Sequence, residues 1–288
     1  MTRLFGRFKR KWRRLTPSFR GLQPVADPET SAYILGFSSQ SPEARSYAET
    51  HLARFLKTIE ITPTAQEDDR LLEMGAYLQI TPALKRLGYG EVRGCYLGQL
   101  GETHAKTVTS TTGEVFSCEV DLFDAEKDIY PYPDAHFATV VCCELLEHLA
   151  EDPMHLMSEV NLILRPGGTL VLSTPNICAL RAVAAVLLGG HPGLYTQYTA
   201  RKGGNAIEPR HAREYTPSEM EQLFEAAGFQ THDLQTGPYG LQQTTAHDWA
   251  LEAIEHVGCG ADLRDDVIHI VGIKSGVLKE RYPTWLYA

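Results

Sequence analysis

Apolar runs and helix signals alternate along most of the chain. Strand-like runs cover residues 70–75, 91–97, 114–122, 137–143, 169–174, 229–234 and 267–274. The run at 137–143 is apolar on both faces, which is typical of a parallel strand that is covered on both sides. Helix start and stop signals lie between the runs, at 81–88, 153–164 and 217–228. The alternation predicts an α/β fold, a doubly wound seven-stranded sheet with helices on both faces.

A helical segment precedes this sheet. The pattern over residues 41–59 predicts a helix, because Ser41 can cap it, Pro42 suits its first turn and apolar residues recur at helical spacing. We assign residues 31–67 to an N-terminal helical segment that covers the sheet. Residues 68–288 form the main domain.

Residues 1–30 have the composition of a separate arm. Their first 20 residues hold eight Lys or Arg and no acid, whereas the whole chain has a net charge of −9. Leu4, Phe8, Trp12 and Leu15 recur at helical spacing between the basic residues. This pattern fits peripheral contact of residues 1–20 with an anionic membrane. A disordered solvated tail, or a helix packed on the body, is the alternative. The acidic body argues against nucleic acid as the main substrate.

Cysteine usage and hydropathy bear on the compartment. No apolar run reaches the ~18 residues that a membrane-spanning helix needs. The six cysteines form no CxxC pair, and several lie in strand-like runs, which favours buried reduced thiols. We expect a cytoplasmic protein, at the inner face of the membrane if the arm binds lipid.

A long segment without helix or strand signals covers residues 189–215. Its aromatic and basic residues are Tyr195, Tyr198, Arg201, Lys202, Arg210, His211, Arg213 and Tyr215. Aromatic rings stack on sugars or flat acceptors, and arginines clamp carboxylates or phosphates. We expect a lid over an acceptor pocket, hinged at its glycines. Padding of the sheet, or a contact in a homodimer, is the alternative.

Several short motifs appear in a fixed order along the main domain. They are Leu72-Glu73-Met74-Gly75, Asp121-Leu122, Cys143-Glu144-Leu145-Leu146-Glu147-His148-Leu149, Leu164-Arg165-Pro166-Gly167-Gly168 and Ser173-Thr174-Pro175-Asn176. In this order, over about residues 68–275, the chain resembles class I S-adenosylmethionine-dependent methyltransferases. The resemblance implies a Rossmann-like sheet whose last strand is antiparallel, with S-adenosylmethionine as cofactor.

The resemblance also implies a cofactor site at the carboxyl ends of the strands. Its candidate residues are Glu73, Gly75, Ala76, Tyr77, Tyr96, Asp121, Leu122 and Glu144. Gly75 allows close backbone approach, and Glu73 holds a loop amide or the cofactor's ammonium group. Asp121 accepts from the adenine amino group, and Glu144 faces the methionine moiety. A plain turn for Gly75, a turn or cap for Asp121 and a solvated loop acid for Glu144 are the simpler interpretations.

The chain departs from the family pattern at two places. The pattern acid-x-Gly-x-Gly-x-Gly loses its later glycines, which are replaced by Tyr77 and Gln79. The acid that grips the ribose hydroxyls aligns with Tyr96, and a tyrosine cannot accept two hydroxyl bonds as a carboxylate does. The degenerate glycine motif therefore leaves open whether the cofactor is bound productively.

The implied reaction is direct transfer of a methyl group to a nucleophile. A sugar hydroxyl needs a base, and His148 and His211 are the candidates, with structural or surface roles as the alternative. No ligand spacing indicates a metal site. We expect O-methylation of a small-molecule or glycan-like acceptor. The main alternative is a degenerate methyltransferase fold that binds a ligand or partner without turnover. An NAD-dependent oxidoreductase is disfavoured, because the loop after the first strand lacks G-x-G-x-x-G.

Overall fold

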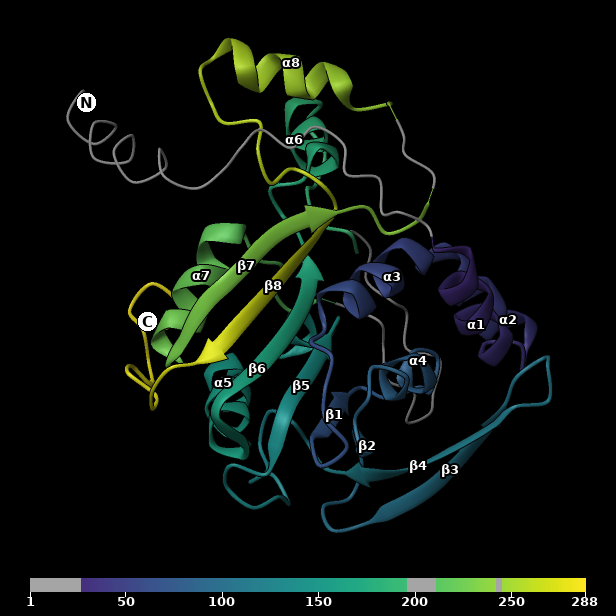
Figure 1. Ribbon diagram of the computed structural model, residues 1–288. Coiled ribbons are helices and arrows are strands. Elements are labelled where there is room, and N and C mark those ends of the chain that lie inside the picture. Colours follow the sequence, from purple (N-terminus) through teal and green to yellow (C-terminus); the bar gives the residue numbers. More distant parts are fainter. Residues whose placement is uncertain (1–26, 196–210, 242–244) are drawn as a thin grey trace, which may run out of the picture.

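The computed structural model describes residues 27–195, 211–241 and 245–288 (Figure 1). The predicted membrane contact of residues 1–20 therefore lies outside the described residues. The same holds for Tyr198, Arg201, Lys202 and Arg210 of the expected lid. Among the described residues, no helix has both the length and the apolar character needed to cross a membrane.

Eight strands form one sheet in the order β3-β4-β2-β1-β5-β6-β8-β7. The strands are β1 (Arg70–Met74), β2 (Glu91–Tyr96), β3 (Thr103–Thr109), β4 (Val115–Leu122), β5 (Phe137–Cys143), β6 (Leu164–Pro175), β7 (Phe229–Gly237) and β8 (Val267–Lys274). Strands β4, β2, β1, β5 and β6 are parallel, and β8 runs antiparallel to β6 and β7. The doubly wound α/β sheet with an antiparallel last strand is confirmed.

One edge strand adds to the seven that the sequence predicts. Strand β3 pairs antiparallel with β4 along its whole length, and most of its side chains are exposed. Its sequence, Thr-His-Ala-Lys-Thr-Val-Thr, is mainly polar because neither face is fully covered. The other strands are recognised by their runs of buried apolar residues, and β3 has no such run.

Helices cover both faces of the sheet (Figure 1). On one face lie α1 (Pro28–Phe37), α2 (Pro42–Thr50), α3 (Leu52–Ile61) and α4 (Thr81–Lys85). On the other lie α5 (Pro153–Ile163) and α7 (Pro217–Ala226). Strand neighbours divide between the two cores: Leu71 and Val141 pack towards α3 and α4, whereas Leu72 and Val140 pack towards α5 and α7. Because successive side chains point to opposite faces of the sheet, each central strand is buried on both faces.

The N-terminal helices differ in detail from the prediction. The expected helix over 41–59 is two helices, α2 and α3, which meet at His51. Ser41 does cap α2 by accepting from the amide of Ala44, and Pro42 is in its first turn. Helix α1 begins at Pro28 after the cap Asp27, so three residues assigned to the arm belong to it.

The remaining elements lie near the carboxyl ends of the parallel strands. The short 3₁₀ helix η3 (Leu146–His148) follows β5, and α6 (Leu180–Leu187) follows β6. Helix α6 contacts α8 (Asp248–His256) beyond this edge of the sheet (Figure 1). Ligands of open α/β sheets bind at this edge.

Candidate cofactor and acceptor site

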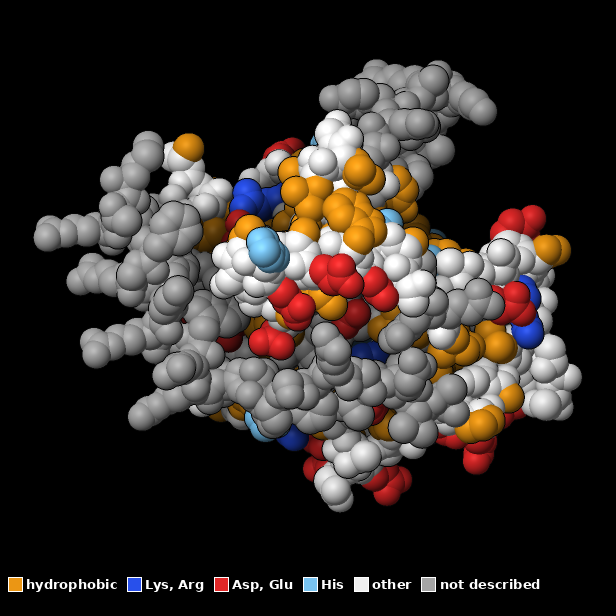
Figure 2. All heavy atoms as spheres, turned by 90° about the horizontal axis from the view of Figure 1, so that it is seen from above, with side chains coloured by type: hydrophobic (Ala, Val, Ile, Leu, Met, Phe, Trp, Pro, Cys, Tyr) orange, Lys and Arg blue, Asp and Glu red, His pale blue; other side chains and the backbone are white. Residues whose placement is uncertain are grey.

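A cavity of about 960 Å³ opens at the carboxyl ends of β1, β2 and β5. Helices α2 and α3, the loop after β4 and the segments around residues 194, 211 and 239 complete its lining. Figure 2 views the molecule from the side of α6 and α8, where acidic and hydrophobic side chains lie side by side near the centre of the face. Its lining residues fall into two groups, which we call its two parts: one on β1 and β2 and one on β5 and α3.

The loop after β1 keeps one glycine of the family pattern and changes course after it. Gly75 has a φ of +70°, and a Cβ built on it would meet nothing within 4 Å, so its backbone is open to the cavity. Leu78 is buried with a φ of +63°, a strained conformation for a branched residue. Ala76 does not line the cavity. It is fully buried over Gly94 of β2, and its amide donates to the carbonyl of Cys95.

Glu73 is the last but one residue of β1 and lines the cavity. It is buried, and its Oε2 has no hydrogen-bond partner among the described residues. Burial raises the pKa of Glu73 to about 7. An unpaired carboxyl oxygen in such a position is suited to a ligand that brings a donor or a positive charge.

Two tyrosines replace a carboxylate at the end of β2. The hydroxyls of Tyr77 and Tyr96 lie 2.7 Å apart, and their rings meet edge to face with centroids 5.1 Å apart. Both residues line the cavity, and Tyr77 is 66% exposed. Only one of the two hydroxyl protons is used in their mutual bond, so the pair still offers one donor and several lone pairs.

Asp121 does not have the role that the resemblance implies. It does not line the cavity. Arg93 donates to it twice, from Nε at 2.9 Å and Nη2 at 2.8 Å, and the hydroxyls of Thr103 and Tyr132 add bonds of 2.7 and 2.9 Å. Burial opposes ionisation, but the Arg93 guanidinium and the two hydroxyls hold the pKa of Asp121 below its usual range. Its acceptor positions are filled, so Asp121 is a structural residue.

The prediction that Leu122 contacts the cofactor is corrected in the same way. Asp124, the next acidic residue after Asp121, lines the cavity. Leu122 packs with Leu78 and Val120 in a small core and does not line the cavity. The cavity is lined instead by residues 124–126 of the following loop. Asp124 Oδ1 accepts from the amide of Glu126 at 2.9 Å, which fixes the carboxylate at the rim. A side chain within a strand projects from one face of the sheet, whereas a side chain in the following loop can reach the carboxyl edge where ligands bind.

Glu144 lines the cavity between the end of β5 and the start of η3. It follows β5 with a φ of +52°, an unusual conformation for a residue other than glycine. The hydroxyl of Ser173 on β6 donates to its Oε1 at 3.0 Å, and its amide donates to the carbonyl of the same residue at 2.9 Å. Strain of this kind is found at functional sites, where the surrounding structure over-determines it.

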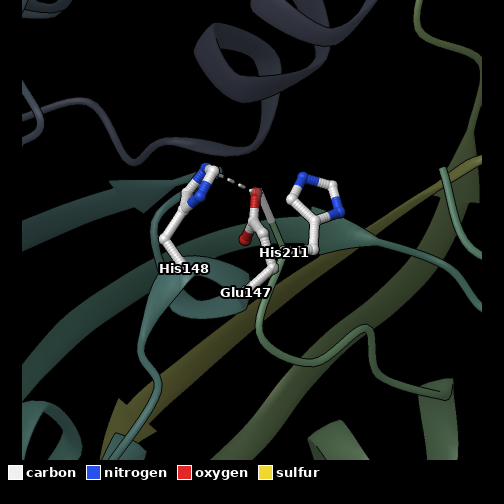
Figure 3. A group of neighbouring side chains, drawn as sticks. All are labelled: Glu147, His148 and His211. Atoms are coloured by element: carbon white, nitrogen blue, oxygen red, sulfur yellow. Dashed lines mark ion pairs between the residues drawn. The ribbon is translucent and has the colours of Figure 1, made fainter. Parts of the chain in front are cut away.

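Both candidate histidines meet beside a buried glutamate (Figure 3). Glu147 is 1% exposed. Its Oε2 accepts from Thr174 at 3.0 Å, and its Oε1 lies 3.9 Å from Nε2 of His148. His211 bonds Glu214 through Nδ1 at 2.9 Å. Burial, reinforced by the charge of Glu144, raises the pKa of Glu147. The motif after β5 places Glu147 in a turn whose polar residues can point into the cleft, without a specific role for it.

Aromatic side chains and one arginine complete this part of the cavity. Tyr195 of the expected lid packs its ring on His211, with centroids 4.5 Å apart. Arg54 of α3 is buried in the lining and donates to the hydroxyl of Tyr47 at 3.0 Å, while its Nε has no partner among the described residues. No motif marks Arg54, because it lies outside the region of resemblance.

Two other lid residues do not face the cavity. Arg213 pairs with Glu219 at 2.6 Å on the surface, which anchors it to the start of α7. Tyr215 is fully buried in the core on the α5 and α7 side. The expectation that these two side chains contact the acceptor is therefore wrong.

The comparisons with known proteins agree with this architecture. The methyltransferase domain family matches residues 44–234. A relative from Mycolicibacterium smegmatis, named "Probable S-adenosylmethionine-dependent methyltransferase", is 34% identical over 114 residues, which cover 40% of this chain and 37% of that protein. The ubiquinone biosynthesis O-methyltransferase of Aeromonas salmonicida is 30% identical over 110 residues, 38% of this chain and 42% of that protein. The aligned parts thus span about two fifths of these relatives' own length.

A solved structure also superposes on much of the chain. An S-adenosylmethionine-dependent methyltransferase from Archaeoglobus fulgidus superposes with a TM-score of 0.48 at 15% identity, over 80% of this chain and 94% of that one. The cavity fits the family's cofactor, because it combines an open glycine backbone at Gly75, an unpaired carboxyl oxygen on Glu73 and a rim carboxylate on Asp124. The chain belongs to the class I methyltransferase-domain family, whose cofactor is S-adenosylmethionine.

Proposed function

We propose that this protein methylates a hydroxyl oxygen of a small or glycan-like acceptor. The observation that carries the proposal is the cluster of Glu147, His148 and His211 in the same cavity as Glu73 and Gly75. Proton-accepting side chains in one part of the cavity and the cofactor residues in the other are what transfer to a hydroxyl requires.

Residues at the ends of β1 and β2 would hold the cofactor. Gly75 offers backbone approach, Glu73 an unpaired oxygen and Asp124 a rim carboxylate. The paired hydroxyls of Tyr77 and Tyr96 would meet the ribose in place of a carboxylate. S-Adenosylmethionine, when bound, supplies a methyl group on a sulfonium sulfur that a nucleophile can accept.

The other part of the cavity would bind and orient the acceptor. The rings of Tyr47, Tyr195 and Tyr239 line it and suit the flat face of a sugar or aromatic ring. Arg54, buried with an unpaired Nε, favours an acceptor with a carboxylate or phosphate. His148 or His211 would take the hydroxyl proton, because a neutral imidazole is the natural base near neutral pH.

Ligand binding without turnover is the second candidate. It is favoured by Tyr77 and Tyr96, since hydroxyls at the ribose position bind more weakly than a carboxylate. Calorimetry with S-adenosylmethionine, S-adenosylhomocysteine and NAD separates these functions from an oxidoreductase. We expect binding of the first two and none of NAD.

Activity is tested with isotope-labelled S-adenosylmethionine and pairs of acceptors. The two acceptors of a pair are the same except that one carries a hydroxyl group where the other carries an amine. Uronic acids and hydroxybenzoic acids provide the hydroxyl and the anionic group. We expect labelled methyl ethers, and a 10²- to 10⁴-fold loss of turnover in His148→Ala or His211→Ala with cofactor affinity unchanged. His104→Ala, an exposed histidine on β3, is the matched control. Transfer to amines only, or full turnover in both cavity variants, contradicts the proposal.

A further inference from the structure

The side chains of Glu147, His148 and His211 converge from two separate segments (Figure 3). One ligand atom from each lies within 4.8 Å of the other two. Glu147 and His148 are the last two residues of η3. His211 belongs to the segment 189–215, the expected lid. The backbone ties the two segments together, because the amide of Ala212 donates to the carbonyl of Glu147 at 2.7 Å.

The buried carboxylate is incompletely satisfied. Glu147 is 1% exposed, and its Oε1 has no hydrogen-bond partner among the described residues. Thr174 holds the other oxygen at 3.0 Å, so the unpaired oxygen is fixed on the side of the two imidazoles. A buried carboxyl oxygen without a donor is costly, and a positive charge placed against it removes that cost.

A second carboxylate orients one of the imidazoles. Nδ1 of His211 bonds Oε1 of Glu214 at 2.9 Å, and Glu214 is held in turn by the amide of Leu194 at 2.7 Å and by Arg181 at 3.5 Å. Nε2 of His211 is therefore the nitrogen left for a ligand. Metal-binding histidines usually donate their other ring nitrogen to a carboxylate in this way.

The charge of the cavity also favours a cation. Five acids line it, namely Glu73, Asp124, Glu126, Glu144 and Glu147. In the part of the lining that the structure describes, Arg54 is the single Lys or Arg. A cavity wall with this balance raises the local concentration of cations.

We propose that Glu147, His148 and His211 bind a divalent transition-metal ion in the acceptor part of the cavity. Two imidazoles and one carboxylate suit Zn²⁺ or the similar ion Co²⁺, whereas Mg²⁺ and Ca²⁺ prefer oxygen ligands alone. With metal–ligand bonds of about 2.1 Å, tetrahedral ligand atoms lie roughly 3.4 Å apart. Nε2 of His148 lies 3.9 Å from Oε1 of Glu147, so a small shift of the imidazole would bring the two atoms to this spacing.

The spacing of residues along the chain does not reveal this metal site. His211 lies far along the chain from the adjacent pair Glu147 and His148, so no ligand spacing connects them. Three protein ligands leave coordination positions open towards the cavity. If the proposed O-methylation holds, the bound ion would replace the two imidazoles as the group that activates an acceptor hydroxyl at such a position, and the proton would pass to solvent.

The test is metal binding by the full chain, without a tag, cofactor or acceptor, so that failure of the methyltransferase proposal does not affect it. The exposed Cys259 is changed to serine to remove a competing ligand. The protein is freed of metal with a chelator and titrated with Co²⁺ by visible absorption and with Zn²⁺ by calorimetry. We expect one ion per chain, imidazole-type rather than thiolate-type Co²⁺ spectra, and no binding of Mg²⁺ at the same concentrations.

Variants decide which residues hold the ion. Glu147→Gln and His211→Ala should each lower the affinity at least 100-fold, and Glu214→Gln should lower it about 10- to 100-fold through the orientation of His211. His104→Ala is the matched control, because it removes an exposed histidine that lies 3.6 Å from Glu102. Thermal unfolding with and without Zn²⁺ confirms that each variant folds. No ion bound by the folded wild type, or equal binding by wild type and Glu147→Gln, overturns the proposal.

Discussion

Two buried carboxylates at the ligand edge of the sheet have opposite surroundings. Asp121, at the junction of β2 and β4, is 5% exposed and receives four hydrogen bonds from three side chains. Glu147, after β5, is 1% exposed and receives one side-chain bond, from Thr174. The pKa of Asp121 is lowered chiefly by Arg93 against the effect of burial, and burial raises the pKa of Glu147.

The difference separates a structural acid from a chemical one. The donors of Asp121 come from strands and loops that the fold itself brings together, so nothing is left for a ligand. Glu147 keeps one oxygen unpaired and turned towards the cavity, beside two imidazoles. Perturbed groups in a cavity, rather than buried acids in general, are the candidates for function.

Loss of Asp121 should give the largest effect on stability. Asp121→Ala leaves the guanidinium of Arg93 without its main partner, and we expect the free energy of unfolding to fall by roughly 3–5 kcal/mol. Urea unfolding measures it. Glu119→Ala is the control, because Glu119 also pairs with Arg93, at 2.6 Å, but is exposed and should cost less than about 1 kcal/mol. A small loss in Asp121→Ala, combined with weaker cofactor binding, would return Asp121 to the cofactor site.

Glu73 offers an intermediate case, buried in the cavity lining with a pKa raised to about 7 by burial. Its folded pKa lies above the unfolded value near 4.5. The stability it contributes is therefore full below pH 4.5 and is lost as the pH rises through 7. From pH 5 to 8 the wild type should lose about 2–3 kcal/mol relative to Glu73→Gln. Urea unfolding of both proteins across this range is the measurement.

The control for this pH dependence is Glu102→Gln, because Glu102 is exposed and should follow the wild type at every pH. Parallel stability curves for the wild type and Glu73→Gln would mean that Glu73 is ionised and paired in the ligand-free protein.

Most of the sheet could be predicted because its buried strands consist of runs of apolar residues. The run of Phe137–Cys143 is apolar throughout, since β5 lies between two cores. Strand β3 was missed because most of its side chains are exposed. The break at His51 was also missed, because the apolar spacing of Leu52 and Phe55 continues that of the preceding helix.

The candidate site could be predicted only where it follows strand ends. Glu73, Gly75, Tyr96 and Glu144 lie near or after the ends of strands and line the cavity, and their contact with the cofactor stays a prediction. Asp121 failed, because its partners come from neighbouring strands and leave no local signal. The same limit hides Arg54, since a single helix sequence does not show which face meets the cavity.

The smallest expected effect concerns the paired tyrosines, which stand where the family pattern has a carboxylate. The hydroxyl of Tyr96 is part of a chain with Tyr77, so its loss in Tyr96→Phe removes one neutral hydrogen bond from the cofactor site. We expect cofactor affinity to fall by about 0.5–1.5 kcal/mol in calorimetry. Tyr96→Asp supplies a charged acceptor instead and should bind more tightly than Tyr96→Phe, since bonds to a carboxylate are about twice as strong. Tyr282→Phe, an exposed tyrosine near the end of the chain, should bind as the wild type does. If Tyr96→Asp bound more weakly than Tyr96→Phe, the ribose would not lie at the end of β2, and the hydroxyl pair would belong to the acceptor.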